Sequence, residues 1–399
     1  MTVSLREFYR KYAFTIWVLV FVAASMARPD LFRSWFGTDL KVLIVPLIQI
    51  ITFGMGTTLS GRDFKNVLTM PGPVLIGIGL QFTIMPLAGF AIAMAFGFPP
   101  EVAAGLILIG SVSSGVASNV MTYLAGGNVP LSVTITACAT ILSTLVTPFW
   151  MKTLAGRFIP VPFEGMMLSI FNMIIIPIVA GLAAHRLLYG ERDWAERKAQ
   201  WTMAGFAALA SAGAVLSTPA SAWGALIALK GGIALGFILL GLTILAKLII
   251  TLGLRGPANW MDKVLPVISM AGICLIIAVI TAQSRDQLLS VGPLLILAAA
   301  LLNGLGYGLG YGSARLARLD ERACRAIAME VGLKNGGMAS GLAIDVLKST
   351  SVALAPAIFG PWMNISGSLL AGWWRRQPVK AASDATAQGG ATQKPKLEG

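Results

Sequence analysis

The sequence predicts an all-α polytopic membrane protein. Apolar residues make up 56% of the 399 residues and charged residues only 12%, whereas charged residues are about a quarter of an average soluble domain. The mean hydropathy is +0.79. The apolar residues gather in stretches of about 20, the length that an α-helix needs to cross the hydrocarbon core of a bilayer. This composition excludes an ordinary soluble globule, and also a disordered chain, which contains few apolar residues.

Twelve apolar stretches are predicted to be membrane-spanning helices. In chain order they cover residues 12–27, 42–60, 74–96, 101–126, 130–155, 163–188, 201–219, 225–254, 264–282, 288–314, 322–346 and 350–374. The pair 201–219 and 225–254 is the least regular, because the first is rich in alanine and serine, and Lys230 and Lys247 flank or interrupt the second. For this pair a re-entrant or interfacial placement stays open.

The basic residues predict the orientation of these helices. With the N-terminus in the cytoplasm, eighteen of the 30 lysines and arginines fall in cytoplasmic loops and eight in outer loops, as the positive-inside rule requires. Both termini are therefore expected in the cytoplasm. Membrane topology thus accounts for the net charge of +13. Nucleic acid is not an expected partner, because no basic soluble module is predicted.

Glu330 and Lys334 stand out because both fall inside a predicted span, where a charge is costly and marks a functional candidate. They are four residues apart, so they are expected to share one helix face. Gly332, Gly336 and Gly337 surround them, and glycines loosen a helix and expose its carbonyls. The structural alternative is a buried ion pair that only neutralises itself.

The span 101–126 is also interrupted by glycines and is rich in hydroxyl groups. On the next span, Ser132 and Thr136 share a face. Small polar residues often hold membrane helices together, but such a cluster facing Glu330 would offer the oxygen ligands that hard cations take. The two interrupted spans are each the fourth of a five-helix half, which suggests inverted repeats. Discontinuous helices at matching places are typical of transporter binding sites, and half-helix N-termini favour anions.

Several motifs on these spans form one pattern. They are Phe53-Gly54-Met55-Gly56, Gln81 to Pro86, Ala117 to Ala125, Gly127-Asn128-Val129, Glu330-Val331-Gly332 with Asn335, and Asn364 to Ala371. Together they are specific, and over nearly the whole chain they resemble the bile acid:sodium symporter family, especially its bacterial members.

The resemblance implies ten helices in two domains. A panel domain would contain the first, second, sixth and seventh helices, and a core domain the other six. In the core the fourth helix (101–126) and the ninth (322–346) would unwind and cross. The chain is thus expected to divide into a first repeat with the sixth helix (1–188), an inserted helical pair without a counterpart in bacterial relatives (189–258), the second-half helices (259–376) and a disordered cytoplasmic tail (377–399).

The resemblance also implies two sodium sites at the crossing. Carried over by position, the first comprises Ser118, Asn119, Ser132, Thr136 and Glu330. The second comprises Gln81, Glu330, the backbone at Val331 and Leu333, and a glutamine at position 334, where this chain has Lys334. We hypothesise that the Lys334 ammonium permanently replaces the second sodium ion. Coupling would then involve one sodium ion or none, and coupling to protons stays open.

The substrate is expected between core and panel, in contact with Asn335, Asn364, Met363 and Val116. The family often has a histidine at position 363 and a Pro-Gly-Gly break where this chain has Ser113-Ser114-Gly115, so the identity of the substrate is not carried over.

The sequence therefore predicts a secondary active transporter of a small organic anion, working by alternating access in the inner membrane of a bacterium. The anion could be bile-acid-like, pantoate-like or another carboxylate. Membrane lipid is an expected partner, and a homo-oligomer stays open. A solute sensor or channel on the same fold, or a sodium-independent carrier, is the alternative. An enzyme is not expected, because Glu330 has no paired acid, histidine cluster or activated nucleophile around it.

Overall fold

The computed structural model describes residues 5–189, 197–254 and 260–377, and each predicted span coincides there with a helix or with consecutive helical segments. The uninterrupted helices are α1 (Leu5–Ala27), α3 (Ile44–Thr58), α5 (Pro71–Phe96), α8 (Val129–Thr153), α11 (Lys198–Ser217), α13 (Trp260–Gln283), α14 (Arg285–Leu316) and α17 (Thr350–Arg375). The tail predicted to be disordered lies outside the described residues from position 378 onward.

Two spans are broken near their middle, as their glycines predict. The span 101–126 consists of α6 (Pro100–Ser111) and α7 (Val116–Leu124), which meet at an angle of 60°. The span 322–346 consists of α15 (Glu321–Gly332) and α16 (Gly336–Asp345). The residues between α6 and α7 are Val112, Ser113, Ser114 and Gly115, so two serines and a glycine lie at the first break.

Two further spans contain π-helical turns. The segment η3 (Phe171–Ile175) joins α9 (Phe163–Ile170) to α10 (Ile176–Tyr189), and η6 (Leu248–Gly253) extends α12 (Lys230–Lys247). The loops carry the 3-10 turns η1 (Leu40–Leu43), η2 (Ala155–Arg157), η4 (Ala220–Ala222) and η5 (Gly224–Leu229), and the short helices α2 (Asp30–Arg33) and α4 (Gly61–Thr69).

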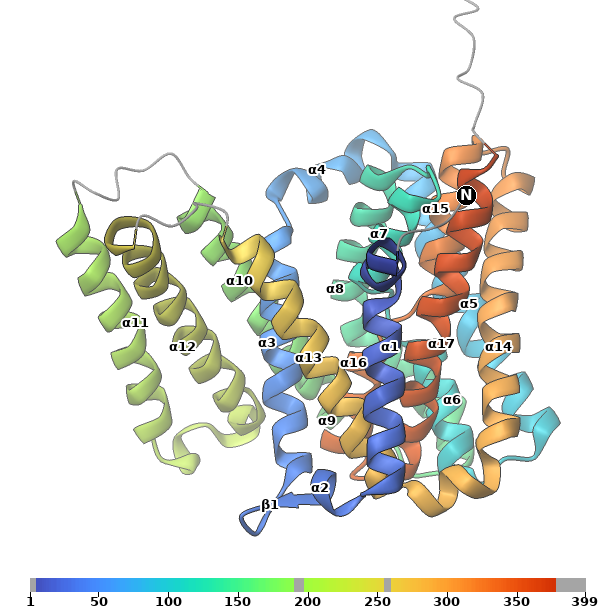
Figure 1. Cartoon of the computed structure of the whole chain (residues 1–399), viewed down its shortest axis with the longest axis horizontal. Coiled ribbons are helices and arrows are strands. Elements are labelled where there is room, and N and C mark those ends of the chain that lie inside the picture. The colour runs from blue at the N-terminus through green and yellow to red at the C-terminus, as the bar shows by residue number, and fades with distance from the viewer. Residues whose placement is uncertain (1–4, 190–196, 255–259, 378–399) are drawn as a thin grey trace, which may run out of the picture.

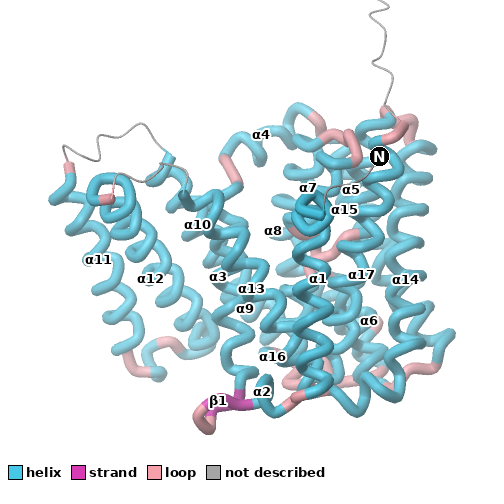
Figure 2. Tube along the Cα trace, viewed as in Figure 1, coloured by secondary structure: helices cyan, strands magenta, loops and turns pink. Residues whose placement is uncertain are grey.

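One small hairpin is the only sheet among the described residues (Figure 2). The strands β1 (Ser34–Trp35) and β2 (Thr38–Asp39) pair in antiparallel fashion. Phe36 and Gly37 turn the chain with positive φ angles of 49° and 79°, as a type I′ turn requires.

Length and apolarity identify seven helices in the described part of the chain that could cross a membrane, and the bent pair α6–α7 would be an eighth. Shorter apolar stretches lie in α1 and α13, at Ile16–Ala27 and Val267–Gln283. The protein is thus an all-α polytopic membrane protein. The count of twelve crossings stays a prediction, because α15, α16 and α17 are helical at the predicted places but too short or too polar for this criterion.

The helices form three neighbouring groups. In one, α1 packs on α13, α13 on α3, and α3 on α10. In the second, α5 packs on α6, α8, α14 and α15, and α17 packs on α6, α7, α14 and α16. The third is the pair α11–α12, which stands at one side of the molecule and contacts the rest mainly through α10 (Figure 1).

The two broken helices lie inside the second group. Every residue of α6 from Val102 to Ser111 is buried, and so is every residue of α15 from Ala323 to Gly332. Non-helical backbone at membrane depth is tolerated where protein encloses it. The surrounding helices can therefore supply partners for the backbone groups that the two breaks release.

Candidate functional site

The two breaks are joined directly. The backbone N–H of Asn335 donates to the carbonyl oxygen of Ser113 over 2.8 Å. Asn335 also caps α16, because its Oδ1 accepts from the Met338 N–H at 3.0 Å. Gly115 is the N-cap of α7. The positive ends of two half-helices therefore meet in the interior of the bundle.

A cluster of side-chain oxygens surrounds Glu330, which is fully buried near the end of α15. Ser114 and Ser132 each donate a hydroxyl hydrogen bond of 2.5 Å, one to each carboxylate oxygen. Thr136 Oγ1 lies 3.0 and 2.9 Å from the same two oxygens. Asn119 completes the cluster, because its Oδ1 lies 2.8 Å from Ser132 Oγ and 3.2 Å from Thr136 Oγ1.

The hydroxyl groups of this cluster supply fewer hydrogen-bond donors than there are acceptor oxygens within reach. The Ser132 and Thr136 hydroxyls have one proton each, yet each lies within hydrogen-bond distance of both Asn119 Oδ1 and Glu330. No lysine or arginine nitrogen comes within 4.0 Å of the Glu330 carboxylate in the described ranges. Because a buried carboxylate needs a compensating partner, and hydroxyl, amide and carboxylate oxygens are hard-cation ligands, these residues fit an alkali cation.

All five residues predicted for the first sodium site lie within hydrogen-bond distance of another member of the cluster, and Ser118 has the longest contact. Its hydroxyl donates to the Gly115 carbonyl at 2.6 Å, and its Oγ is 3.4 Å from Thr136 Oγ1. Sequence reasoning missed Ser114 as a member of this cluster. The signal was present, because the predicted break at Ser113-Ser114-Gly115 removes Ser114 from helical geometry and turns its side chain toward the crossing.

Lys334 lies beyond the end of α15, and this corrects one expectation. The helix ends at Gly332 and Leu333 is extended, with φ −97° and ψ 131°, so Glu330 and Lys334 do not share a helix face. Nor do they form an ion pair within 4.0 Å. The ammonium points instead toward α5, where Nζ lies 3.4 Å from the Gln81 carbonyl oxygen and 5.8 Å from the centre of the Phe82 ring.

The other residues predicted for the second site are close by but differently engaged. The Gln81 side chain accepts from the Ser114 N–H through Oε1 at 3.0 Å, and its buried Nε2 has no partner among the described residues. Val331 is buried, and the Leu333 N–H bonds to the Met329 carbonyl at 3.0 Å. The ammonium therefore contacts the backbone of Gln81, where the sequence had suggested its side chain.

A cavity of about 520 Å³ opens beside the two breaks, within the range of small-molecule sites. All four predicted substrate contacts line it, namely Asn335, Asn364, Met363 and Val116. The opposite wall comes from α3 and α13. Sequence reasoning missed the polar groups of that wall, which are Thr52, Thr57, Thr58 and Ser269.

The shape of this cavity is asymmetric along the bundle. It extends to Thr58 at the end of α3 and to Met261 at the start of α13, the side where the basic residues predict the cytoplasm. Toward the other side α16 packs closely on its neighbours. A Cβ atom at Gly341 would lie 2.5 Å from Ile48 Cδ1, and the Ser169 hydroxyl donates to Asp345 Oδ2 at 2.5 Å.

Comparison with known proteins agrees with this arrangement. The model of the sodium bile acid symporter family matches residues 45–220. An uncharacterized sodium-dependent transporter of Bacillus subtilis, YocS, is 32% identical over 92% of this chain and 92% of its own length. The probable chloroplastic sodium/metabolite cotransporter BASS1 of Arabidopsis thaliana is 27% identical, over 93% of this chain and 75% of the relative.

A more distant relative comes from a mammal. The ileal sodium/bile acid cotransporter of Oryctolagus cuniculus is 23% identical over 80% of this chain and 74% of its own length. These three relatives are named as a transporter or as cotransporters. The chain therefore belongs to the sodium bile acid symporter family and is a membrane transporter.

Proposed function

We propose that the protein is a secondary active transporter that couples one sodium ion to the movement of a small organic anion. The observation that carries this proposal is the proton-poor oxygen cluster around the buried Glu330 carboxylate, which fits an alkali cation. Asn119, Ser132 and Thr136 would hold the ion with Glu330, and Ser114 joins them as a further ligand or as the residue that orients the carboxylate.

The anion would bind in the cavity beside this cluster. The N-terminal turns of α7 and α16 line it at Gly115 to Ala117 and Asn335 to Gly337, so two helix dipoles favour negative charge there. The remaining wall is mostly apolar, with Ile48, Ile51, Ile273, Ile276 and Ile277. An amphipathic carboxylate, bile-acid-like, pantoate-like or related, matches this combination.

Lys334 would take the place of a second sodium ion. Its ammonium is buried in the core against a backbone carbonyl, and an ammonium carries the same charge as the ion that it would replace. Lys334 also lines the cavity, but its ammonium lies against the Gln81 carbonyl of α5, and we therefore assign it to the cation side of the site. A sodium-independent carrier would need the Glu330 cluster to work without a metal ion.

Alternating access would move two groups of helices against each other. The proposed panel is α1, α3, α9–α10 and α13, and the proposed core is α5–α8 with α14–α17. The contacts within each group support this division, and the closed side at Gly341 and open side at Thr58 correspond to a cytoplasm-facing state. The charge distribution supports a bacterial inner membrane location with both termini in the cytoplasm.

Thermal unfolding of the purified protein tests the coupling. Small carboxylates are added in sodium chloride or potassium chloride, and we expect a carboxylate to raise the Tm more in sodium. Glu330→Gln should abolish the sodium response. Glu101→Gln, the same change on the exposed first turn of α6, should leave it intact. Equal stabilisation in both salts, unchanged by Glu330→Gln, would contradict sodium coupling.

A further inference from the structure

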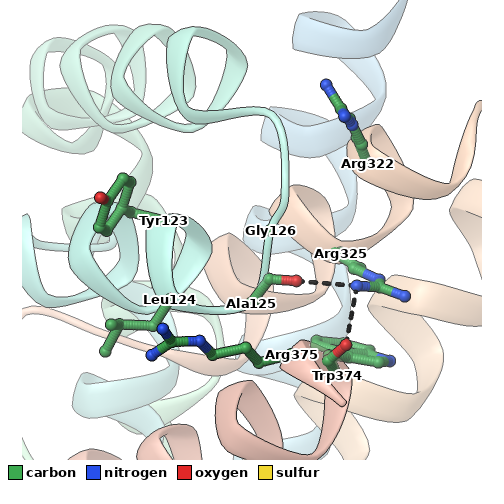
Figure 3. A pocket seen from close by; sticks show the side chains of 8 residues that line it. All are labelled: Tyr123, Leu124, Ala125, Gly126, Arg322, Arg325, Trp374 and Arg375. Carbon is green, nitrogen blue, oxygen red and sulfur yellow. Dashed lines mark hydrogen bonds between the residues drawn. The ribbon is translucent and has the colours of Figure 1, made fainter. Parts of the chain in front are cut away.

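A second pocket of about 400 Å³ lies at the end of the bundle opposite the closed contact at Gly341 (Figure 3). It is formed where α7 ends, α15 begins and α17 ends. Its lining residues are Tyr123, Leu124, Ala125, Gly126, Arg322, Arg325, Trp374 and Arg375. The positive-inside distribution places this end at the cytoplasmic surface of the membrane.

Arg325 is a structural part of the wall. Its guanidinium donates to the carbonyl oxygens of Ala125, Trp374 and Gln377 at 2.8, 3.2 and 2.8 Å, and to Glu321 Oε1 at 2.8 Å. Figure 3 shows the bonds to Ala125 and Trp374, which tie the ends of α7 and α17 to α15. The charge of Arg325 and four of its five N–H donors are therefore already engaged within the protein.

Arg322 and Arg375 differ from Arg325 in this respect. Both are exposed, and within the described ranges neither side chain has an acidic partner within 4.0 Å. The neighbouring acids are engaged elsewhere, because Glu321 pairs with Arg325 and Arg315, and Asp320 caps α15 through the Ala323 N–H. Figure 3 shows their guanidinium groups on different sides of the pocket, that of Arg375 near Leu124 and that of Arg322 turned away from Ala125, so an anion bound by both would draw these exposed side chains toward each other.

The pocket adjoins side chains suited to the boundary between headgroups and acyl chains. Tyr123 is 73% exposed at its rim, and Trp373 is 54% exposed beside Trp374. Leu369, one turn earlier on α17, is 62% exposed on the same helix face as Trp373. Aromatic side chains gather at the membrane–water interface, and leucine is stable in the hydrocarbon.

We propose that this pocket binds the phosphodiester headgroup of an acidic phospholipid of the cytoplasmic leaflet. Arg322 and Arg375 would donate to the phosphate oxygens, since guanidinium pairs well with phosphate, and Trp373 and Leu369 would contact the lipid's apolar part. Basic pockets between helices on the cytoplasmic side are suited to such headgroups. The bound lipid would bridge α15 and α17 at the end of the core that Arg325 also ties together.

The test measures lipid binding and needs no transported solute, so its outcome is independent of the proposed substrate and of sodium coupling. The full chain is placed in nanodiscs of phosphatidylcholine alone or with one fifth phosphatidylglycerol, and Tm and bound lipid after mild extraction are measured. The variant Arg322→Gln/Arg375→Gln is compared with Arg197→Gln/Lys198→Gln. This control removes two exposed charges at the start of α11, on the helical pair set apart from the pocket.

We expect phosphatidylglycerol to raise the Tm of the parent and the control, and the pocket variant to retain about tenfold less of the lipid. Equal retention by the pocket and control variants would overturn the proposal. The proposal would also be overturned if millimolar inorganic phosphate raised the Tm of the detergent-solubilised protein as much as phosphatidylglycerol does. The pocket would then be a site for a soluble anion and not for a lipid. A far-ultraviolet circular dichroism spectrum like that of the parent shows that the pocket variant is folded.

Discussion

The ammonium of Lys334 lies 3.4 Å from the backbone carbonyl oxygen of Gln81. A carbonyl oxygen can coordinate a sodium ion, and it can also accept a hydrogen bond from an ammonium group. The contact joins α5 to the break between α15 and α16 in the proposed core. The covalently attached ammonium of Lys334 can therefore hold these two segments together where a sodium ion would otherwise be needed. Within the described part of the chain, the nearby buried amide nitrogen of the Gln81 side chain has no hydrogen-bond partner.

Replacing Lys334 by glutamine should increase the dependence on sodium. The substitution removes the tethered charge and supplies an amide oxygen near the Gln81 carbonyl, so a second ion can enter. We expect the Tm of Lys334→Gln to rise more steeply with sodium chloride than that of the parent, at ionic strength held constant with potassium chloride. Lys334→Met removes the charge without supplying an oxygen ligand and should gain no sodium response. Identical sodium curves for all three proteins would refute the replacement hypothesis.

Ser114 and Ser113 provide a matched pair for testing the oxygen cluster. Both are fully buried, but the Ser114 hydroxyl donates to Glu330 whereas that of Ser113 donates to the Met338 sulfur, at 3.9 Å. Hydrogen bonds to charged groups contribute about 1.5–3 kcal/mol, so Ser114→Ala should weaken sodium binding about tenfold or more. Ser113→Ala should change it little. Sodium titrations followed by intrinsic tryptophan fluorescence would measure both, and equal effects would show that Ser114 has no special role.

The site could be predicted from the sequence where helical geometry holds. Ser132 and Thr136 are one turn apart on an intact helix, and the structure brings both to Glu330. Prediction failed where the helix ends, because spacing rules say nothing about an extended residue such as Leu333. The direction of the Lys334 side chain and the contact of Ser114 therefore follow only from the three-dimensional structure.

The helical spans could be predicted from the length of the apolar stretches, and both helix breaks could be predicted from their glycines and serines. The π-helical segment η3 had no sequence signal. It matters because Asn172 within it joins two groups of helices: its Oδ1 accepts from the Gly232 N–H of α12 at 2.7 Å, and its carbonyl accepts from the Gln49 side chain of α3 at 3.1 Å. Asn172 thus ties α12 to the proposed panel, in addition to the packing of α12 on α10.

Two adjacent glycines test this anchor. A Cβ atom at Gly232 would overlap with Asn172, whereas one at Gly231 meets nothing within 4 Å. Gly232→Ala should therefore destabilise the protein by about 1–3 kcal/mol through overpacking and lower the Tm. Gly231→Ala should be neutral or slightly stabilising, because alanine is the better helix former. If both variants melt like the parent, α12 does not depend on its close contact with Asn172.

The contact between α16 and α3 is expected to hold the outer side closed. Gly341 lets the helices approach so closely that a Cβ atom would lie 2.5 Å from Ile48 Cδ1 and 3.1 Å from Met173 Sδ. Asp345, one turn further along α16, accepts from Ser169 of α9. A larger side chain at Gly341 would separate the helices and shift the population away from the state with the cytoplasmic opening.

Gly341→Val should therefore make the cytoplasmic opening less accessible. Thr58 is exposed and lines that opening, so Thr58→Cys in a background without Cys138, Cys274 and Cys324 reports on it. We expect a membrane-impermeant maleimide to label this cysteine several-fold more slowly in inside-out vesicles when Gly341 is valine. Gly304→Val is the control, because a Cβ atom at Gly304 on α14 meets nothing within 4 Å. Labelling that slows equally in both variants would mean that valine acts through general destabilisation, and unchanged labelling would mean that Gly341 does not keep the outer side closed.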